Sequence, residues 1–146
     1  MTPLFIGIAG PPCAGKSTLC TALSKERSDI THVSMEDFYK DTGSAPFYKG
    51  HRNLDSPKSI EFSALKATLD KLRDGKEISV PVYSKNHSTQ IGTKIVRPSK
   101  VLLVDGFLLF WHKRIRDMLD LKIYIDIDFK THIGNLPLQR IHSHPQ

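Results

Sequence analysis

Gly10-Pro11-Pro12-Cys13-Ala14-Gly15-Lys16-Ser17 decides the fold. This stretch matches G-x-x-x-x-G-K-[S/T], the pattern of a loop that wraps around nucleotide phosphates. The apolar run 4–9 before it predicts a buried strand, and residues 15–26 after it predict a helix. Strand, Gly-rich turn and helix is the context that the motif requires. The sequence therefore predicts a nucleotide-binding α/β fold.

The spacing within the loop follows from the chemistry of phosphate binding. Gly10 and Gly15 lack a Cβ atom, which lets the chain curl so that backbone N–H groups converge on one phosphate group. The following helix adds its N-terminal N–H groups and the positive end of its dipole. Lys16 is expected to reach the β- and γ-phosphates, and the Ser17 hydroxyl to ligate Mg²⁺. With ATP and Mg²⁺ as the expected cofactors, the predicted nucleotide-binding residues are Gly10, Cys13, Ala14, Gly15, Lys16, Ser17 and Thr18.

Composition is that of an ordinary globular domain with a basic balance. The 146 residues suffice for one domain with a core, and 39% hydrophobic and 25% charged residues are typical values. The net charge of +6 suits polyanionic ligands such as nucleotides. No run of five or more Lys/Arg occurs, which argues against a dedicated nucleic-acid surface.

The two cysteines and the hydropathy pattern indicate where the chain works. Cys13 and Cys20 are predicted to be free thiols in a reducing compartment, because a disulfide there would distort the loop. Their spacing is not that of a metal site. Residues 1–9 carry no basic segment typical of a signal peptide, and no apolar run reaches the roughly 18–20 residues that span a bilayer. We expect a cytoplasmic protein without membrane or nucleic-acid partners.

Strands and helices are expected to alternate along the rest of the chain. Alternation of this kind predicts a doubly wound parallel sheet with helices on both faces. Pro81 limits its segment to an edge strand, and Gly75 is expected to close the preceding helix. The expected elements are strands at 30–34, 101–105 and 121–126, helices at 58–74 and 111–119, an extended piece at 78–83, a hairpin or loop over 84–97, and a loop over 41–52.

Two carboxylates are expected at the edge of the sheet where ligands bind. Asp105 ends the buried strand 101–105, where an acid can hold Mg²⁺ directly or through water. Asp37 follows strand 30–34 at the same carboxyl edge, where it could deprotonate an attacking hydroxyl. The alternatives are a polar residue that merely ends a strand, for Asp105, and a capping residue in a connecting loop, for Asp37.

Four further motifs, in order, resemble the uridine kinase and nicotinamide riboside kinase group of P-loop kinases. They are Val33 to Lys40 (VSMEDFYK), Asn53 to Pro57 (NLDSP), Val80 to Tyr83 (VPVY) and Val104 to Phe110 (VDGFLLF). The third looks like uridine kinases, and the fourth more like nicotinamide riboside kinases. The resemblance, which covers about residues 4–128, implies ATP-dependent phosphorylation of a ribonucleoside 5′-hydroxyl. Nicotinamide riboside is the first expectation, with uridine or cytidine as the alternative.

The resemblance also implies roles for individual residues. Asp37 would accept the proton of the 5′-hydroxyl, and Asp55 would bind the ribose 2′- and 3′-hydroxyls. Tyr83 would lie near the base, and Asp105 would help hold Mg²⁺. One carboxylate can accept both hydrogen bonds from vicinal hydroxyls. The expected catalytic residues are Asp37 and Lys16, and the expected substrate-binding residues are Asp37, Phe38, Asp55 and Tyr83.

Two departures from the group's pattern qualify this expectation. The residue before Asp55 is Leu54, where the group usually has an aromatic side chain that can stack on the base. The group also continues into an Arg-rich lid helix, a fifth strand and a closing helix, whereas residues 129–146 offer only Lys130 and Arg140. Arginines of a lid clamp the phosphates and help to exclude water.

The end of the sequence therefore divides the expected domain organisation. We predict an incomplete P-loop kinase domain over 1–128, lacking the last strand and lid, and an irregular or disordered tail over 129–146. An exposed sheet edge would make a homodimer plausible, although the sequence leaves the oligomeric state open. A truncated nucleotide-binding isoform with impaired catalysis stays an alternative to an active kinase. A P-loop GTPase is disfavoured because no N-K-x-D element occurs.

Overall fold

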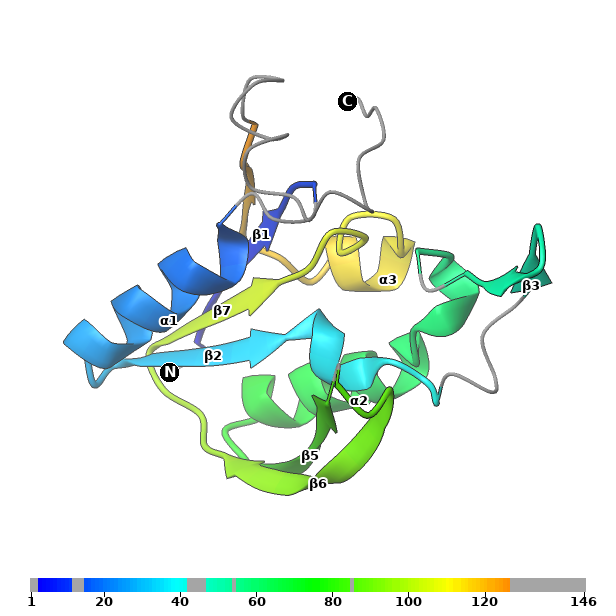
Figure 1. Cartoon of the computed structure of the whole chain (residues 1–146). Helices are drawn as coiled ribbons and strands as arrows, with labels where there is room; N and C mark the ends of the chain where they lie inside the picture. Colours follow the sequence, from blue (N-terminus) through cyan, green and yellow to red (C-terminus); the bar gives the residue numbers. More distant parts are fainter. Residues whose placement is uncertain (1–2, 12–14, 42–46, 54, 85, 127–146) are drawn as a thin grey trace.

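A four-stranded parallel sheet forms the centre of the protein. In the computed structural model, which describes residues 3–11, 15–41, 47–53, 55–84 and 86–126, the strand order is β2-β7-β1-β8. All neighbouring pairs are parallel, so the carboxyl ends of the strands lie at one edge (Figure 1). The strands are β1 (Leu4–Ala9), β2 (Ile30–Ser34), β7 (Val101–Asp105) and β8 (Leu121–Tyr124).

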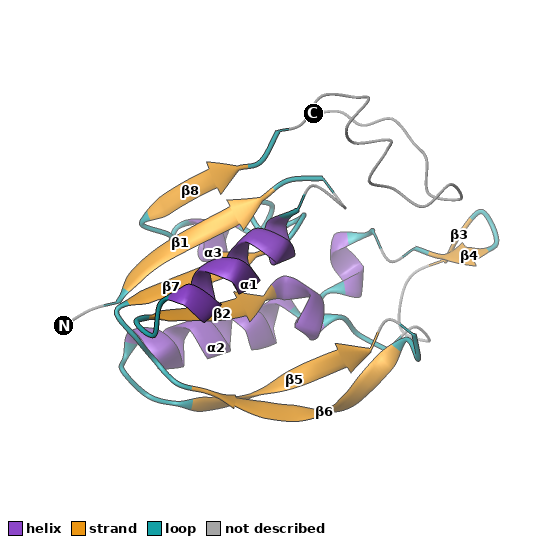
Figure 2. Cartoon of the chain, turned by 60° about the vertical axis from the view of Figure 1, so that its left-hand side comes forward, coloured by secondary structure: helices purple, strands orange, loops and turns teal. Residues whose placement is uncertain are grey.

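Helices cover both faces of this sheet, as the alternating pattern predicts. Successive β7 side chains point to opposite faces, so Leu103 packs with the α1 residue Cys20 while Leu102 and Val104 pack with the larger core that includes Leu65 of α2. Figure 2 shows α1 and α2 on either side of the strands. The two helices are α1 (Lys16–Glu26) and α2 (Phe62–Arg73). The predicted α/β fold class is confirmed by this arrangement.

The helix expected over 58–74 is divided in the structure. The Ser56 hydroxyl accepts a hydrogen bond from the Lys58 N–H and caps a short 3-10 turn, η3 (Pro57–Ser59). Ile60 then pairs with Tyr39 in an isolated antiparallel bridge, so α2 begins only at Phe62. Gly75 follows the C-cap with φ of 78°, the left-handed conformation expected at that position. The helix start was therefore predicted several residues too early.

A β-hairpin lies beside the central sheet and packs near α2 (Figure 2). It consists of β5 (Ile78–Ser84) and β6 (Thr89–Val96), which pair antiparallel with Pro81 opposite Thr93. The expected extended piece at 78–83 is thus confirmed, whereas the segment 84–97, expected to be a hairpin or loop, supplies a single strand that pairs with it. A small second hairpin, β3 (Phe47–Tyr48) and β4 (His51–Arg52), occupies part of the region expected to be loop.

The last described elements are shorter than the sequence predicts. α3 covers Lys113–Arg116 within the expected helix 111–119, and β8 ends at Tyr124 rather than residue 126. No helix in the part of the chain that the structure describes is long and apolar enough to span a membrane. Asp128 and the predicted tail 129–146 lie outside the described residues, so the expectations on the tail and the lid stay predictions.

Candidate active site

The backbone around the phosphate-binding loop is set by two glycines. A Cβ atom at Gly10 would lie 2.7 Å from the Ile125 carbonyl oxygen, so only glycine fits there without moving the backbone. Gly15 is the N-cap of α1 with φ of 92°, a left-handed conformation that favours glycine. Because the N-cap is a glycine, no N-cap side chain bonds to the first turn of α1. Cys13 and Ala14, also predicted to bind nucleotide, lie outside the described residues.

The Lys16 ammonium group is held within this loop. Lys16 is only 8% exposed, and its Nζ donates a hydrogen bond of 2.9 Å to the Pro11 carbonyl oxygen. Ser17 and Thr18 follow on the exposed side of the first helical turn. A cation fixed at a helix N-terminus, beside the backbone N–H groups of the first turn, is a suitable arrangement for binding phosphate.

Asp105 lies at the centre of a group of polar side chains beside the loop. Its Oδ1 atom accepts hydrogen bonds from Ser34 Oγ at 3.2 Å and from Ser17 Oγ at 3.5 Å. Its Oδ2 atom pairs with Nε2 of His32, and its carboxyl is 1% exposed. We call Ser17, Cys20, His32, Ser34 and Asp105 the Asp105 cluster. The structure thus brings together Ser17 and Asp105, the two predicted Mg²⁺ ligands.

The periodicity of three elements explains why these residues meet. Ser17 and Cys20 are three apart on α1 and share one face of the helix. His32 and Ser34 are two apart on β2 and share one face of the strand. Ser34 is paired in register with Asp105 on β7, and α1 packs over both strands. Sequence reasoning missed Cys20, His32 and Ser34, although these spacings could have grouped them once Asp105 had been chosen.

Cys20 has an environment that keeps its thiol protonated. Burial raises its pKa to about 12, and the charge of Asp105 and a hydrogen bond to Asp105 add to the rise, while Lys16 opposes it. The thiol is therefore neutral near pH 7. Cys20 is free and buried, which confirms that expectation for this cysteine, whereas Cys13 lies outside the described residues.

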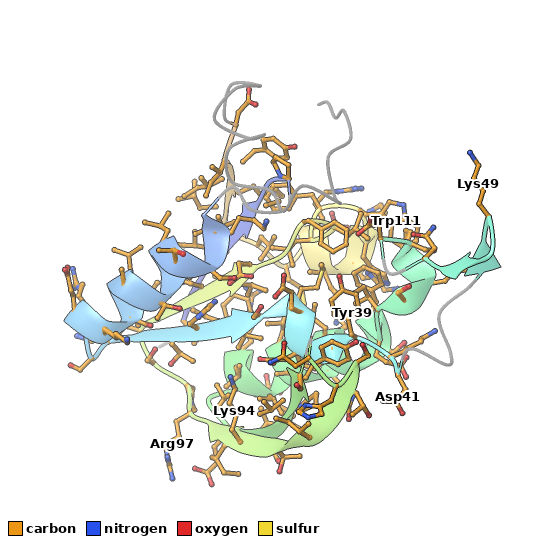
Figure 3. All side chains as sticks on the ribbon, in the orientation of Figure 1. Tyr39, Asp41, Lys49, Lys94, Arg97 and Trp111 are labelled. Atoms are coloured by element: carbon orange, nitrogen blue, oxygen red, sulfur yellow. The ribbon has the colours of Figure 1, made fainter. Side chains whose placement is uncertain are left out.

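Asp37 lies in η1 (Met35–Phe38), the 3-10 turn that follows β2. The turn is capped by Ser34 Oγ, which accepts a hydrogen bond of 3.3 Å from the Glu36 N–H. Asp37 Oδ1 accepts a hydrogen bond of 3.2 Å from the Tyr83 N–H, and Oδ2 lies 3.3 Å from Nζ of Lys94. Lys94 reaches from β6 toward η1 (Figure 3). Two predicted substrate residues, Asp37 and Tyr83, therefore meet, with a lysine that the sequence analysis did not identify.

The two aromatic positions expected in the substrate site differ in exposure. Phe38 is 1% exposed and packs in the main core, where it holds η1 against the sheet. The centroid of the Tyr83 ring lies 5.2 Å from the centroid of the Tyr39 ring. Figure 3 shows Tyr39 close to the β5–β6 hairpin. The buried Tyr83 hydroxyl finds no hydrogen-bond partner within the described residues. A bound ligand could supply that partner.

Asp55 belongs to an exposed turn that is fastened to the segment after β2. Asn53 Oδ1 accepts a hydrogen bond of 3.1 Å from the Asp55 N–H, and the buried Ser59 hydroxyl donates to the Asn53 carbonyl oxygen at 2.6 Å. The main chain of Ser59 accepts a 2.8 Å hydrogen bond from the Lys40 N–H. The segments that carry Asp37 and Asp55 are thus joined through the main chain. Leu54, the departure at the predicted base position, lies outside the described residues.

Comparison with known proteins places this geometry in one family. Residues 5–140 match the profile of the phosphoribulokinase / uridine kinase family. The chain is 32% identical to a protein named probable uridine-cytidine kinase from Caenorhabditis elegans, over 91% of this chain and 59% of that protein. It is 35% identical to a protein named uridine kinase from Leuconostoc citreum, over 88% of this chain and 64% of that protein.

A solved structure agrees with the fold. The structure of a possible uridine kinase from Bacillus stearothermophilus superimposes with a TM-score of 0.73, at 19% sequence identity, covering 92% of this chain and 77% of that chain. The chain spans 59% and 64% of the length of the two relatives named above.

Proposed function

The chain belongs to the phosphoribulokinase / uridine kinase family, and from this premise we propose that it transfers the γ-phosphoryl group of ATP to the 5′-hydroxyl of a pyrimidine ribonucleoside, uridine or cytidine. The observation that carries the proposal is the arrangement of a P-loop lysine, the Asp105 cluster and the Asp37–Tyr83 contact after the carboxyl ends of adjoining strands. Ligands of open α/β sheets bind at this edge.

The choice of base departs from the first expectation. Nicotinamide riboside was favoured by the resemblance of Val104 to Phe110, and no relative reported above carries that name. The relatives' names support the alternative, uridine or cytidine, and so does the Pro81-x-Tyr83 element. Nicotinamide riboside stays a second candidate because of the acid-Gly-Phe run that ends β7.

In the proposed reaction the chain mainly positions the reactants and neutralises charge. Lys16 and the N-terminal end of α1 hold the phosphates, and Asp37 accepts the proton of the 5′-hydroxyl. Ser17 and Asp105 offer two hard oxygen donors 3.5 Å apart, which suits Mg²⁺. Mg²⁺, when bound, neutralises charge on the phosphates. Asp55 reads the ribose hydroxyls, and the Tyr83 hydroxyl gains a partner from the substrate.

Turnover with a panel of nucleosides tests this proposal. We expect ATP-dependent product with uridine and cytidine, less or none with nicotinamide riboside, and none with adenosine. Product analysed by mass spectrometry should carry one added phosphate. Product only with nicotinamide riboside would overturn the choice of base. ATP binding without product from any nucleoside would overturn the kinase proposal and favour the catalytically impaired alternative.

Asp55→Ala is expected to weaken binding of uridine about 10- to 100-fold without changing ATP affinity. A hydrogen bond to a charged group contributes roughly 1.5–3 kcal/mol, which corresponds to that range. Calorimetric titration with uridine and with 2′-deoxyuridine measures the effect, because the deoxy analogue keeps only the 3′-hydroxyl and should lose less affinity than uridine does. The control is Asp70→Ala, which removes an exposed carboxylate from α2. Unchanged uridine affinity in Asp55→Ala would show that the ribose is read elsewhere.

A further inference from the structure

Three side chains of different chemistry meet at Asp105, which is one of the two predicted Mg²⁺ ligands. The Cys20 thiol comes from α1, the His32 imidazole from β2 and the Asp105 carboxylate from β7. Their sulfur, nitrogen and oxygen atoms all lie within 4.8 Å of one another. We propose that Cys20, His32 and Asp105 form a binding site for Zn²⁺.

The donor set selects zinc over magnesium. Thiolate sulfur, imidazole nitrogen and carboxylate oxygen are the three ligand types that Zn²⁺ takes in proteins. Mg²⁺ prefers oxygen ligands in an octahedral arrangement and is a poor match for a sulfur ligand. Tetrahedral zinc at bond lengths of about 2.0–2.3 Å holds its ligand atoms roughly 3.3–3.8 Å apart. Only small side-chain movements are needed, with the His32–Asp105 hydrogen bond replaced by two bonds to the metal.

Two of the three proposed ligands are buried, and the third, His32, is partly exposed to solvent. Cys20 is 0% and Asp105 1% exposed, whereas the His32 side chain is 18% exposed. An ion can therefore enter past His32 and be enclosed by the other two residues. Ser17 and Ser34, which both donate to Asp105 Oδ1, stand beside the fourth position, which a hydroxyl or water can fill.

Charge in the cluster also favours a dication. The ligand atoms of Cys20 and Asp105 lie within 4.8 Å of each other, so a thiolate and a carboxylate would repel each other there. Zn²⁺ between them replaces that repulsion by attraction to a shared centre. A thiol bound to the metal gives up its proton to solvent, and no other reactant is needed.

Zinc in this site would compete with catalysis. Asp105 cannot serve Mg²⁺ while it is bound to zinc, so micromolar zinc should inhibit phosphoryl transfer. This consequence rests on the proposed function, whereas binding of the metal does not. The Asp105 cluster would thus be an inhibitory metal site next to the phosphate-binding loop.

Cobalt titration of the full chain tests the site without any assay of activity. Co²⁺ replaces Zn²⁺ in such sites and gives a thiolate-to-metal charge-transfer band. We expect one Co²⁺ per chain with this band, displaced by Zn²⁺ and not by excess Mg²⁺. Cys20→Ser should abolish the band, and His32→Asn should weaken Co²⁺ binding at least tenfold. The matched controls Cys13→Ser and His87→Asn should keep the charge-transfer band and the Co²⁺ affinity of the wild type.

Several results would overturn the proposal. A spectrum without the charge-transfer band, or a band that survives Cys20→Ser and disappears in Cys13→Ser, would exclude Cys20 as a ligand. X-ray absorption of the zinc-loaded wild type gives an answer that needs no variant to fold, because one sulfur neighbour at about 2.3 Å is expected. A zinc shell of nitrogen and oxygen alone would equally refute the site.

Inhibition is measured separately. Zinc should inhibit the wild type, and Cys20→Ser should need at least ten times more zinc for the same loss of turnover. If zinc inhibits the two proteins equally while the wild type keeps its cobalt band, the site binds metal but zinc bound there does not inhibit turnover. Absence of turnover in the zinc-free wild type would refute the proposed function and leave the cobalt result unaffected.

Discussion

Lys16→Ala should lower kcat/KM for ATP about a hundredfold to a thousandfold. The lysine is 8% exposed and held at the loop by its hydrogen bond to Pro11, so under the proposed function its charge would act on the phosphates in surroundings with little water. Loss of one preorganised group that stabilises transition-state charge costs roughly 10²–10³ in rate, or about 3–4 kcal/mol. Alanine cannot replace the ammonium group, and ATP affinity should fall as well. Steady-state kinetics and calorimetric titration with ATP measure the two effects.

Lys25→Ala is the matched control, because Lys25 is an exposed lysine in the last turn of the same helix. Its removal lowers the net charge by the same amount and should leave kcat/KM within about twofold of wild type. A similar loss in both variants would mean that overall charge, not the loop lysine, attracts the nucleotide. Wild-type kinetics in Lys16→Ala would refute the assignment of the phosphate-binding loop.

Much of the fold could be predicted because its signals are local. The strands β1, β2 and β7 and the Gly-rich turn before α1 can each be recognised from a few consecutive residues. The start of α2 could not be predicted in the same way. Ser56 and Pro57 look like a helix start, yet the bridge between Ile60 and Tyr39, far apart in sequence, interrupts the helix. Tertiary pairing overrides local propensity at that point.

In the candidate site, too, the residues that could be predicted are those with a local sequence signal. Lys16, Ser17 and Asp105 follow from a motif and a strand end, and their proximity was expected. Lys94 reaches Asp37 only because β6 folds back on β5, a register that alternation of side chains alone does not fix. His32 and Cys20 are neighbours of Asp105 because β2 pairs with β7 in the sheet and α1 packs over both strands.

The contacts of Asp37 bear on its proposed role as the base. Both of its oxygens are engaged with the β5–β6 hairpin, one by the Tyr83 N–H and one by the Lys94 ammonium group. These contacts hold the carboxylate in place, as a base requires, but they also suit an anchor for the hairpin. Glu36 is the neighbouring carboxylate in η1 and is half-buried. Comparison of the two residues decides between these roles.

Asp37→Asn should lower kcat by roughly 10²–10⁴ and leave ATP affinity unchanged, since general-base catalysis contributes that much. Asparagine keeps an oxygen that can accept from the Tyr83 N–H, so the hairpin should stay in place and thermal unfolding should change little. Glu36→Gln is the matched control and should retain most of the turnover. The opposite pattern would assign the base to Glu36. Asp37 would then be an anchor, and Asp37→Asn should lower the midpoint of thermal unfolding more than kcat, because the attraction to Lys94 is lost.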